Sequence, residues 1–221
     1  NKADYEPTAH RFFAIFRDSA VPFELTNAPE GITGVTAPLI PKIPEAGVKI
    51  LRVGRRLLIE AGDAAEMEEG KEVTLMRWGN AFVDRIERDD AGNVVRVVGR
   101  SNPSGNFKST KQKIAWLADV PGDMFQALTT EFDHQLLVKP KLEEDEDVAD
   151  FVNPHTRADT WVFADPNMRS LRKGQVIQIE RRGFYKVDQP YVNDRLPLRL
   201  YLIPDGRQKA MSTLESALVH R

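Results

Sequence analysis

The sequence repeats itself once: the stretch Gly70-Lys71-Glu72-Val73-Thr74-Leu75-Met76-Arg77-Trp78-Gly79 returns 104 positions later as Gly174-Gln175-Val176-Ile177-Gln178-Ile179-Glu180-Arg181-Arg182-Gly183. Each copy has a glycine turn and then alternating side chains, which is the period of a β-strand. Each ends on Arg-x-Gly and leads into a second strand-like segment, so each predicts a β-hairpin. A hairpin built twice predicts two small β-barrels of related construction, with chance similarity between two hairpins as the alternative.

Most of the other apolar residues lie in short runs bounded by turn residues, which is typical of an all-β fold. Residues 26–44, with four prolines and two glycines, predict a loop rather than a sheet. Short helices are expected at 146–152 and 211–219, and one helical turn at 64–69. The predicted strands are residues 11–17, 48–53, 57–61, 72–77, 82–88, 94–98, 113–118, 125–133, 160–164, 175–181, 184–187 and 198–203.

The charge of the chain is segregated. A net charge of −2 by itself argues against a nucleic-acid partner. However, residues 1–150 hold 19 basic and 26 acidic side chains, whereas residues 151–221 hold 12 and 7. Such a distribution suits a protein with one phosphate-facing surface and an acidic back. Solvated faces of unrelated strands are the alternative explanation.

No residue pattern indicates a catalytic centre. The four histidines are scattered without a second ligand at metal spacing, and there is no glycine-rich phosphate loop and no Gly-x-Ser-x-Gly motif. The lack of cysteine excludes disulfide frameworks and thiolate zinc sites. No run approaches the roughly 18 apolar residues of a membrane span. We therefore expect no catalytic residue, metal, cofactor or membrane contact in this chain, and its opening Asn1, in place of Met, indicates a piece of a longer protein.

The second copy of the repeat also predicts where a polar side chain points. Successive side chains of a strand face opposite sides, so Ile177 and Ile179 share one face and Gln178 takes the other. Gln178 is therefore expected to point away from the barrel core. Its amide can offer a ligand both a hydrogen-bond donor and an acceptor.

Seven segments, in order from about residue 5 to 210, span nearly all the chain. They are Pro7-Thr8-Ala9-His10-Arg11-Phe12, Ile40-Pro41-Lys42, residues 69–80, Trp116-Leu117-Ala118, Asp165-Pro166-Asn167-Met168-Arg169, residues 178–185 and residues 201–206. Together these segments resemble the anticodon-binding region of the glutamyl-tRNA synthetase family, in its eukaryotic-type cytosolic form, which includes the glutamyl half of the fused glutamyl-prolyl enzyme. The glutaminyl enzymes share this architecture, but residues 78–80, 153–156 and 201–206 are more similar to the glutamyl branch.

The resemblance implies an all-β fold of two ribosomal-protein-L25-like β-barrels with a few short helices. It suggests a discontinuous proximal barrel, residues 1–60 plus 153–221, and a distal barrel, residues 61–152. It further implies a cytoplasmic glutamate–tRNA ligase whose N-terminal catalytic domain, using ATP and Mg, is absent from this chain. The implied partners are the anticodon stem-loop of tRNA-Glu, that catalytic domain and a multi-synthetase complex.

The family also implies which residues bind RNA. In the glutaminyl branch, an arginine of the opening strand and a glutamine of the Gln-x-Glu-Arg strand read the middle anticodon base, a uridine. The matching residues here are Arg11 and Gln178. By residue type and place, the further RNA-binding candidates are Arg77, Asn80, Lys108, Arg181 and Arg182.

Two other functions remain open at this point. A protein-interaction module of a multi-synthetase assembly is the alternative, with the acidic patch at residues 143–150 facing a partner. An independent β-rich hydrolase would need carboxylates that converge in a cleft, and the sequence shows no sign of such a pair.

Overall fold

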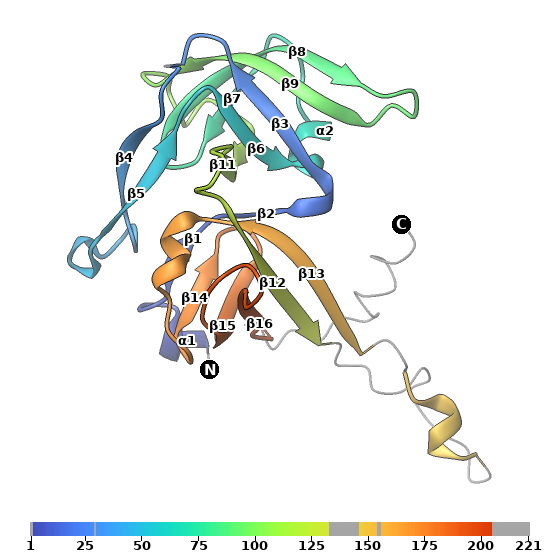
Figure 1. The fold of residues 1–221 in the computed structure, drawn as a ribbon. Coiled ribbons are helices and arrows are strands. Elements are labelled where there is room, and N and C mark those ends of the chain that lie inside the picture. The colour runs from blue at the N-terminus through green and yellow to red at the C-terminus, as the bar shows by residue number, and fades with distance from the viewer. Residues whose placement is uncertain (1, 29, 133–145, 154–155, 205–221) are drawn as a thin grey trace.

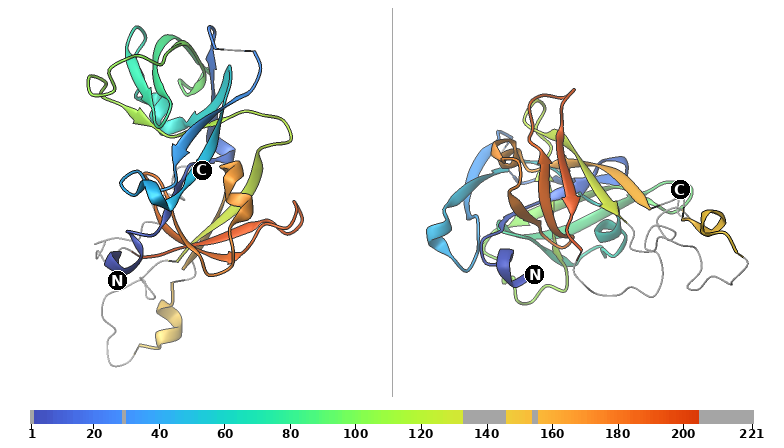
Figure 2. Two further views of the ribbon diagram at one scale, coloured as in Figure 1. Left: turned by 90° about the vertical axis from the view of Figure 1, so that its left-hand side faces the viewer. Right: turned by 90° about the horizontal axis from the view of Figure 1, so that it is seen from below.

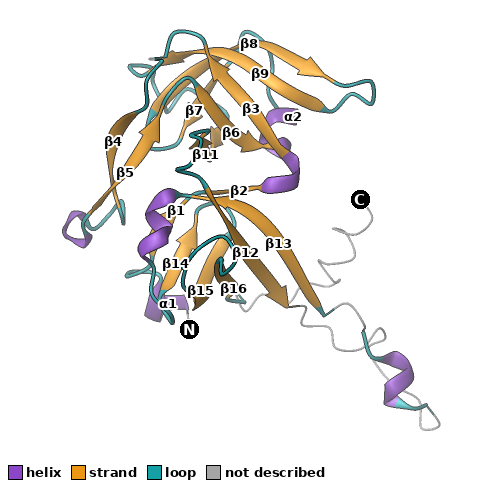
Figure 3. Ribbon diagram, viewed as in Figure 1, coloured by secondary structure: helices purple, strands orange, loops and turns teal. Residues whose placement is uncertain are grey.

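The computed structural model describes residues 2–28, 30–132, 146–153 and 156–204, and two seven-stranded sheets dominate it. The sheets lie one above the other in Figure 1, and Figure 3 shows how little of the chain is helical. The expected helix at 211–219 and residues 143–145 of the acidic patch lie outside the described residues.

The first sheet runs in the order β1-β14-β15-β16-β12-β13-β2, and we call it the first barrel. The second sheet runs β10-β7-β8-β9-β3-β6-β11, and we call it the second barrel. The strands of the first barrel are β1 (His10–Phe12), β2 (Ala14–Phe16), β12 (Phe125–Phe132), β13 (Arg157–Ala164), β14 (Val176–Ile179), β15 (Gly183–Gln189) and β16 (Leu198–Leu202). Those of the second are β3 (Ala20–Leu25), β6 (Arg56–Glu60), β7 (Glu72–Leu75), β8 (Gly79–Arg88), β9 (Val94–Asn102), β10 (Lys113–Ile114) and β11 (Trp116–Ala118).

Both barrels have the same topology. Read along either sheet order, the pairings are parallel, antiparallel, antiparallel, parallel, antiparallel and antiparallel. The repeated hairpins of the sequence are β7–β8 and β14–β15, which occupy the same place in the two sheets. The prediction of two barrels of related construction is confirmed.

Each barrel is nearly closed by one segment that supplies both sheet edges. In the first barrel the edge strands β1 and β2 are separated by Phe13 alone, and in the second β10 and β11 are separated by Ala115 alone. The chain therefore leaves one edge of the sheet and joins the opposite edge within a single residue. This curls each sheet round on itself and leaves few exposed strand edges.

The segment Phe12 to Ile15 contributes to both hydrophobic cores. Phe12 and Ala14 belong to the core of the first barrel, whereas Phe13 and Ile15 belong to that of the second. Because successive side chains of an extended chain point in opposite directions, one strand between two barrels can be buried on both sides. Figure 1 shows β2 in this position between the two sheets.

A two-stranded ribbon reaches from the second barrel alongside the first. It consists of β4 (Thr33–Pro38) and β5 (Val48–Val53), paired antiparallel (Figures 1 and 2). The loop predicted over 26–44 is therefore wrong for residues 33–38. A ribbon of two strands has free edges on both sides, so a proline such as Pro38 at the end of a strand removes no necessary hydrogen bond.

Sheet membership differs from the barrel boundaries expected from the sequence. Strands β3 and β6 lie within residues 1–60 but pair in the second barrel, and β12 lies within 61–152 but pairs in the first. The parallel pairing of Phe23 with Val97 joins distant segments, which local periodicity cannot reveal. The division of the chain into domains stays a prediction.

The helical elements are all short. They are α1 (Lys2–Tyr5), α2 (Ala61–Ala65) and the 3-10 turns η1 (Arg17–Ser19), η2 (Pro44–Ala46), η3 (Val148–Phe151) and η4 (Pro166–Ser170). The helix expected at 146–152 is thus a 3-10 turn, whose first turn is capped by the Asp147 carboxylate accepting from Ala149 N. Within the described ranges, no helix has the length and apolar character to cross a bilayer.

Candidate nucleic-acid interface

Arg11 and Gln178 lie side by side on the outer face of the first barrel. Strands β1 and β14 run parallel, with Arg11 in register with Gln178 and Phe12 in register with Ile179. Phe12 and Ile179 are buried in the core, so the alternation of each strand turns Arg11 and Gln178 outward on the same side. The outward direction expected for Gln178 agrees with this, and two residues from opposite ends of the sequence are brought together.

The Arg11 side chain has an unused donor. Its Nε is buried and has no hydrogen-bond partner among the described residues. A buried N–H without a partner is unfavourable, and because this nitrogen is shielded from solvent, a ligand can pair with it only after the side chain moves. The backbone N–H of Arg11 is satisfied by the carbonyl of Leu39, at 2.9 Å. The backbone at position 11 is therefore anchored to the residue that follows β4.

The first turn of the chain borders this surface. Phe184 pairs with Gln178 across the hairpin and therefore lies on the same outer face. The ring of Tyr5 packs edge-on against Phe184 at 5.1 Å between centroids, and Lys2 Nζ lies 5.6 Å from the Phe184 ring centre. Helix α1 thus covers the position next to Gln178.

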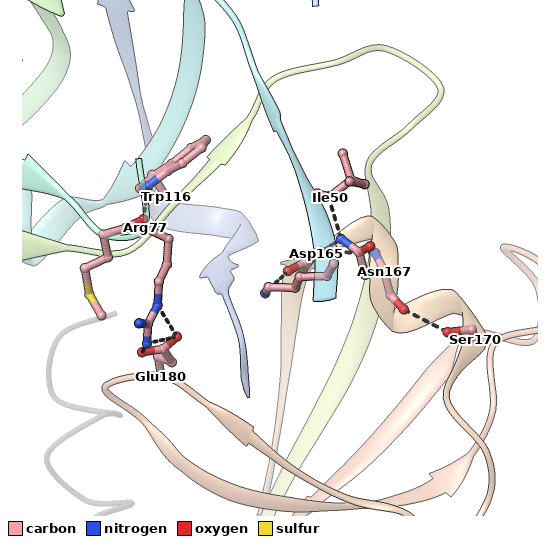
Figure 4. Close-up of polar contacts among 9 residues, drawn as sticks. Ile50, Arg77, Trp116, Asp165, Asn167, Ser170 and Glu180 are labelled. Carbon is pink, nitrogen blue, oxygen red and sulfur yellow. Dashed lines mark hydrogen bonds and ion pairs between the residues drawn. The ribbon is translucent and has the colours of Figure 1, made fainter. Parts of the chain in front are cut away.

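Arg77 is partly buried and pairs with a carboxylate of the other barrel. It lies in the turn between β7 and β8 and donates to Glu180 of the first barrel, with Nη2 at 2.7 Å from Oε2 and 3.0 Å from Oε1 (Figure 4). Glu180 is only 8% exposed. The turn before Arg77 is fixed in addition by the indole N–H of Trp116, which donates to the carbonyl of Met76 at 2.9 Å.

Arg181 and Arg182, which follow β14 of the first barrel, bind carboxylates on the side of the second barrel. Arg181 binds the Asp63 carboxylate of α2, with Nη2 at 2.7 Å from Oδ1, and Arg182 binds the Glu60 carboxylate of β6. The Arg182 guanidinium also lies over the Phe16 ring, 3.5 Å from its centre. Burial, the largest influence, raises the pKa of Glu60, and the Arg182 guanidinium opposes this shift. Three of the predicted RNA-binding arginines therefore join the barrels to each other.

Asn80 and Lys108, the remaining candidates, have opposite environments. Asn80 is 1% exposed, and its Oδ1 accepts from the hydroxyl of Thr74 at 2.8 Å. A side chain so deeply buried cannot touch RNA at the surface. Lys108 is exposed in the loop between β9 and β10, where its backbone N–H donates to Asn106 Oδ1 at 3.0 Å.

A second set of contacts, which sequence reasoning missed, joins the barrels beside the β4–β5 ribbon. Lys49 Nζ of β5 donates to Asp165 Oδ2 at 2.6 Å, and both side chains are almost fully buried. The Lys49 ammonium also lies 4.8 Å from the ring centre of Phe12. Asn167 Nδ2 donates to the carbonyl of Ile50 at 2.9 Å, as Figure 4 shows. The only available signal was the segment 165–169 of the family resemblance, which contains Asp165 and Asn167, whereas Lys49 and Ile50 lie outside the resembling segments.

A surface pocket lies beside the contacts of Lys49 and Asn167. It measures about 550 Å³ and is lined in part by His10, Lys49, Arg169 and Arg172, on the side of β1 opposite Arg11. Among residues 2–28, 30–132, 146–153 and 156–204, no three His, Cys, Asp or Glu side chains are grouped so that they could hold a metal ion.

Comparison with known proteins identifies the family. Two family models match, at residues 9–102 and 113–188, and both are described as tRNA synthetases class I (E and Q), anti-codon binding domain. The cytoplasmic glutamate–tRNA ligase of Arabidopsis thaliana is 41% identical over 207 residues, which are 94% of this chain and 28% of that protein. The probable cytoplasmic glutamate–tRNA ligase of Dictyostelium discoideum is 37% identical over 93% of this chain and 27% of that protein.

The bifunctional glutamate/proline–tRNA ligase of Cricetulus griseus is also similar, with 32% identity over 96% of this chain and 14% of that protein. The chain thus spans less than a third of the length of these relatives. The resemblance seen in the sequence is confirmed: the chain belongs to the anticodon-binding domain family of the class I tRNA synthetases for glutamate (E) and glutamine (Q).

Proposed function

We propose that this chain is the region of a cytoplasmic glutamate–tRNA ligase that binds the anticodon loop of tRNA-Glu, with Arg11 and Gln178 reading the middle uridine. The observation that carries the proposal is the register of Arg11 with Gln178, which places both side chains on one outer face. The names of the relatives support the amino acid and the compartment.

The chemistry of the two side chains suits a uracil edge. Uracil offers two carbonyl acceptors flanking one N–H donor. The Arg11 guanidinium supplies only donors, and the Gln178 amide supplies both a donor and an acceptor. Cytosine has an acceptor and an amino group where uracil has its N–H and one carbonyl, so the same pair would leave polar groups unmatched. Single-stranded loops are read in this way, by hydrogen bonds to the Watson–Crick edges of splayed bases.

The chain contributes recognition to a larger enzyme. ATP-dependent aminoacylation, with Mg, belongs to an N-terminal catalytic domain outside this chain, which the chain contacts as part of one enzyme. The bifunctional relatives favour a multi-synthetase complex as a wider setting. A protein-interaction module alone is not favoured, because both matching families are anticodon-binding domains.

Filter binding of tRNA-Glu and of a variant with cytosine at the middle anticodon position tests the proposal. Arg11→Ala and Gln178→Ala should each weaken binding of the natural tRNA by about 1–3 kcal/mol and change binding of the variant RNA much less. Arg195→Ala, which removes an exposed arginine from the loop between β15 and β16, serves as the control and should leave the discrimination unchanged. Equal losses on both RNAs would exclude a reading role for Arg11 and Gln178.

A further inference from the structure

The loop between β9 and β10 exposes an aromatic ring among lysines. Phe107 is 59% exposed, and its neighbours Lys108 and Lys111 are exposed as well. Residues 103–113 contain three lysines and no acidic residue. An exposed aromatic ring among cations is the combination that binds unpaired nucleotides, because the ring stacks on a base and the cations hold the phosphates.

Hydrogen bonds hold the loop in place. The Thr74 hydroxyl donates to Asn80 Oδ1 at 2.8 Å, so it accepts from the Thr110 hydroxyl at 2.6 Å. The Thr110 hydroxyl also lies 3.2 Å from the carbonyl of Phe107. Buried Asn80 is thus a positioning residue that anchors the loop from below. A loop that is already ordered before binding loses less conformational entropy when the ligand binds.

The loop also packs too closely for a side chain at one position. A Cβ atom at Gly105 would lie 2.5 Å from Glu72 Oε1 and 2.7 Å from Asn80 Nδ2. Both distances are far below van der Waals contact, so these side chains would have to move to admit a larger residue at position 105. Gly105 thus allows the loop to pack closely on the β7–β8 hairpin.

The internal repeat places this loop at the counterpart of the Arg11 surface. Strand β10 pairs with β7 as β1 pairs with β14, and Lys113 is in register with Thr74 as Arg11 is with Gln178. The offset of 104 that relates the hairpins maps Thr74 onto Gln178. In each barrel, the segment that leads into the closing strand covers the outer face of the hairpin: α1 in the first and the Phe107 loop in the second.

We propose that Phe107 stacks on an unpaired base of the same RNA, with Lys108 and Lys111 holding the adjacent phosphates. The inference rests on the proposed function, since it assumes an RNA strand bound to the chain. Every base has a π-face, so stacking tolerates any sequence. Phe107 therefore supplies affinity without selectivity, in contrast to Arg11 and Gln178.

Equilibrium binding of the tRNA-Glu anticodon stem-loop, and of the same stem-loop with its middle base changed, tests this inference. Phe107→Ala should weaken binding of both RNAs by a similar factor, about 5- to 150-fold. Phe107→Tyr should retain binding, whereas Phe107→Leu should lose it, because leucine keeps apolar bulk but has no ring. Phe132→Ala, which removes another exposed ring, is the control.

Each outcome is decisive. If the wild-type chain binds and Phe107→Ala binds equally well, the stacking subsite is overturned while the proposed function stands. Binding by Phe107→Leu as strong as that by Phe107→Tyr also overturns stacking. A wild-type chain that binds neither RNA overturns the proposed function and the subsite with it. Phe107 is exposed, so unchanged urea unfolding of the variants should show that they are folded.

Discussion

Arg77 and Arg181 occupy equivalent turns of the two repeated hairpins, and each binds a carboxylate of the opposite barrel. Both have left-handed backbone conformations, with φ of 71° and 69°, and no other described residue except glycine has a positive φ. Such a conformation costs about 1–3 kcal/mol and persists where the surroundings enforce it. Arg77 binds Glu180 and Arg181 binds Asp63, so the repeated turn acts as a two-way clasp between the barrels.

Removing the Arg77 guanidinium should destabilise the chain. Arg77→Ala leaves the buried Glu180 carboxylate without its partner, and we expect the free energy of unfolding to fall by about 2 kcal/mol. Urea denaturation measures this. Adding Glu180→Gln should recover part of the loss, because no unpaired carboxylate remains at the junction.

An exposed ion pair provides the matched control for Arg77. Arg85 pairs with Glu87 on the surface of β8, so Arg85→Ala should change the free energy of unfolding by less than about 1 kcal/mol. Similar losses for Arg77→Ala and Arg85→Ala would argue against a clasp.

Breaking the buried pair of Lys49 and Asp165 should lower the free energy of unfolding more than Arg77→Ala does. The two side chains are 3% and 1% exposed, and Lys49→Met removes the only ammonium that Asp165 contacts within the described residues. An unpaired buried carboxylate typically costs about 3–5 kcal/mol, which urea denaturation should detect. The double variant Lys49→Met with Asp165→Asn should be more stable than Lys49→Met alone, and the reverse order would contradict this explanation.

Gly99 should tolerate no larger residue. A Cβ atom there would lie 2.1 Å from the backbone oxygen of Phe82 and 2.9 Å from the Phe23 ring. Because backbone atoms of a neighbouring strand cannot move aside, Gly99→Ala should cost at least about 1–3 kcal/mol in thermal or urea unfolding. Gly62 in α2 has open space around it, so Gly62→Ala should instead stabilise by about 0.5–1 kcal/mol. Equal effects at the two glycines would refute the steric argument.

Tyr185 should make the stability depend on alkaline pH. Burial raises the pKa of the Tyr185 hydroxyl, and the nearby Glu131 carboxylate acts in the same direction. The unfolded chain therefore loses this proton at a lower pH than the folded chain. The contribution of Tyr185 to the free energy of unfolding is therefore fully present below about pH 10, the usual pKa of tyrosine, and is lost as the pH rises above it.

Urea denaturation at a series of pH values around 10 can measure this dependence. The free energy of unfolding of the wild-type chain should fall more steeply with pH than that of Tyr185→Phe. Parallel curves for the two proteins would show that the hydroxyl of Tyr185 does not titrate differently in the folded state.

Local alternation predicted much of the fold. Residues 48–53 form β5 as expected, and the two repeated hairpins occupy equivalent places. The burial of Ile177 and Ile179 follows from the period of the strand, which also turns Gln178 outward. Residues 33–38 were predicted as a loop although they form a strand, because prolines and glycines, which usually mark loops, are tolerated in a ribbon with free edges.

The RNA-binding candidates also differ in how much of their environment the sequence could predict. Sequence and resemblance selected Arg11 and Gln178, and the sheet register places them side by side. Arg77, Arg181 and Arg182 were selected by residue type and place, but the carboxylates that they bind lie more than a hundred residues away in the chain. Nothing near them in the sequence identifies those acids.

The order of apolar and polar residues by itself determined the two hairpins, their repetition and the direction in which Gln178 points, because the side of a strand follows from the backbone geometry of adjacent residues. Only the tertiary structure decided which cations remain available to a phosphate. Whether an arginine is satisfied depends on which distant carboxylate the folded chain brings within hydrogen-bond reach. That distance is set by the packing of one barrel on the other.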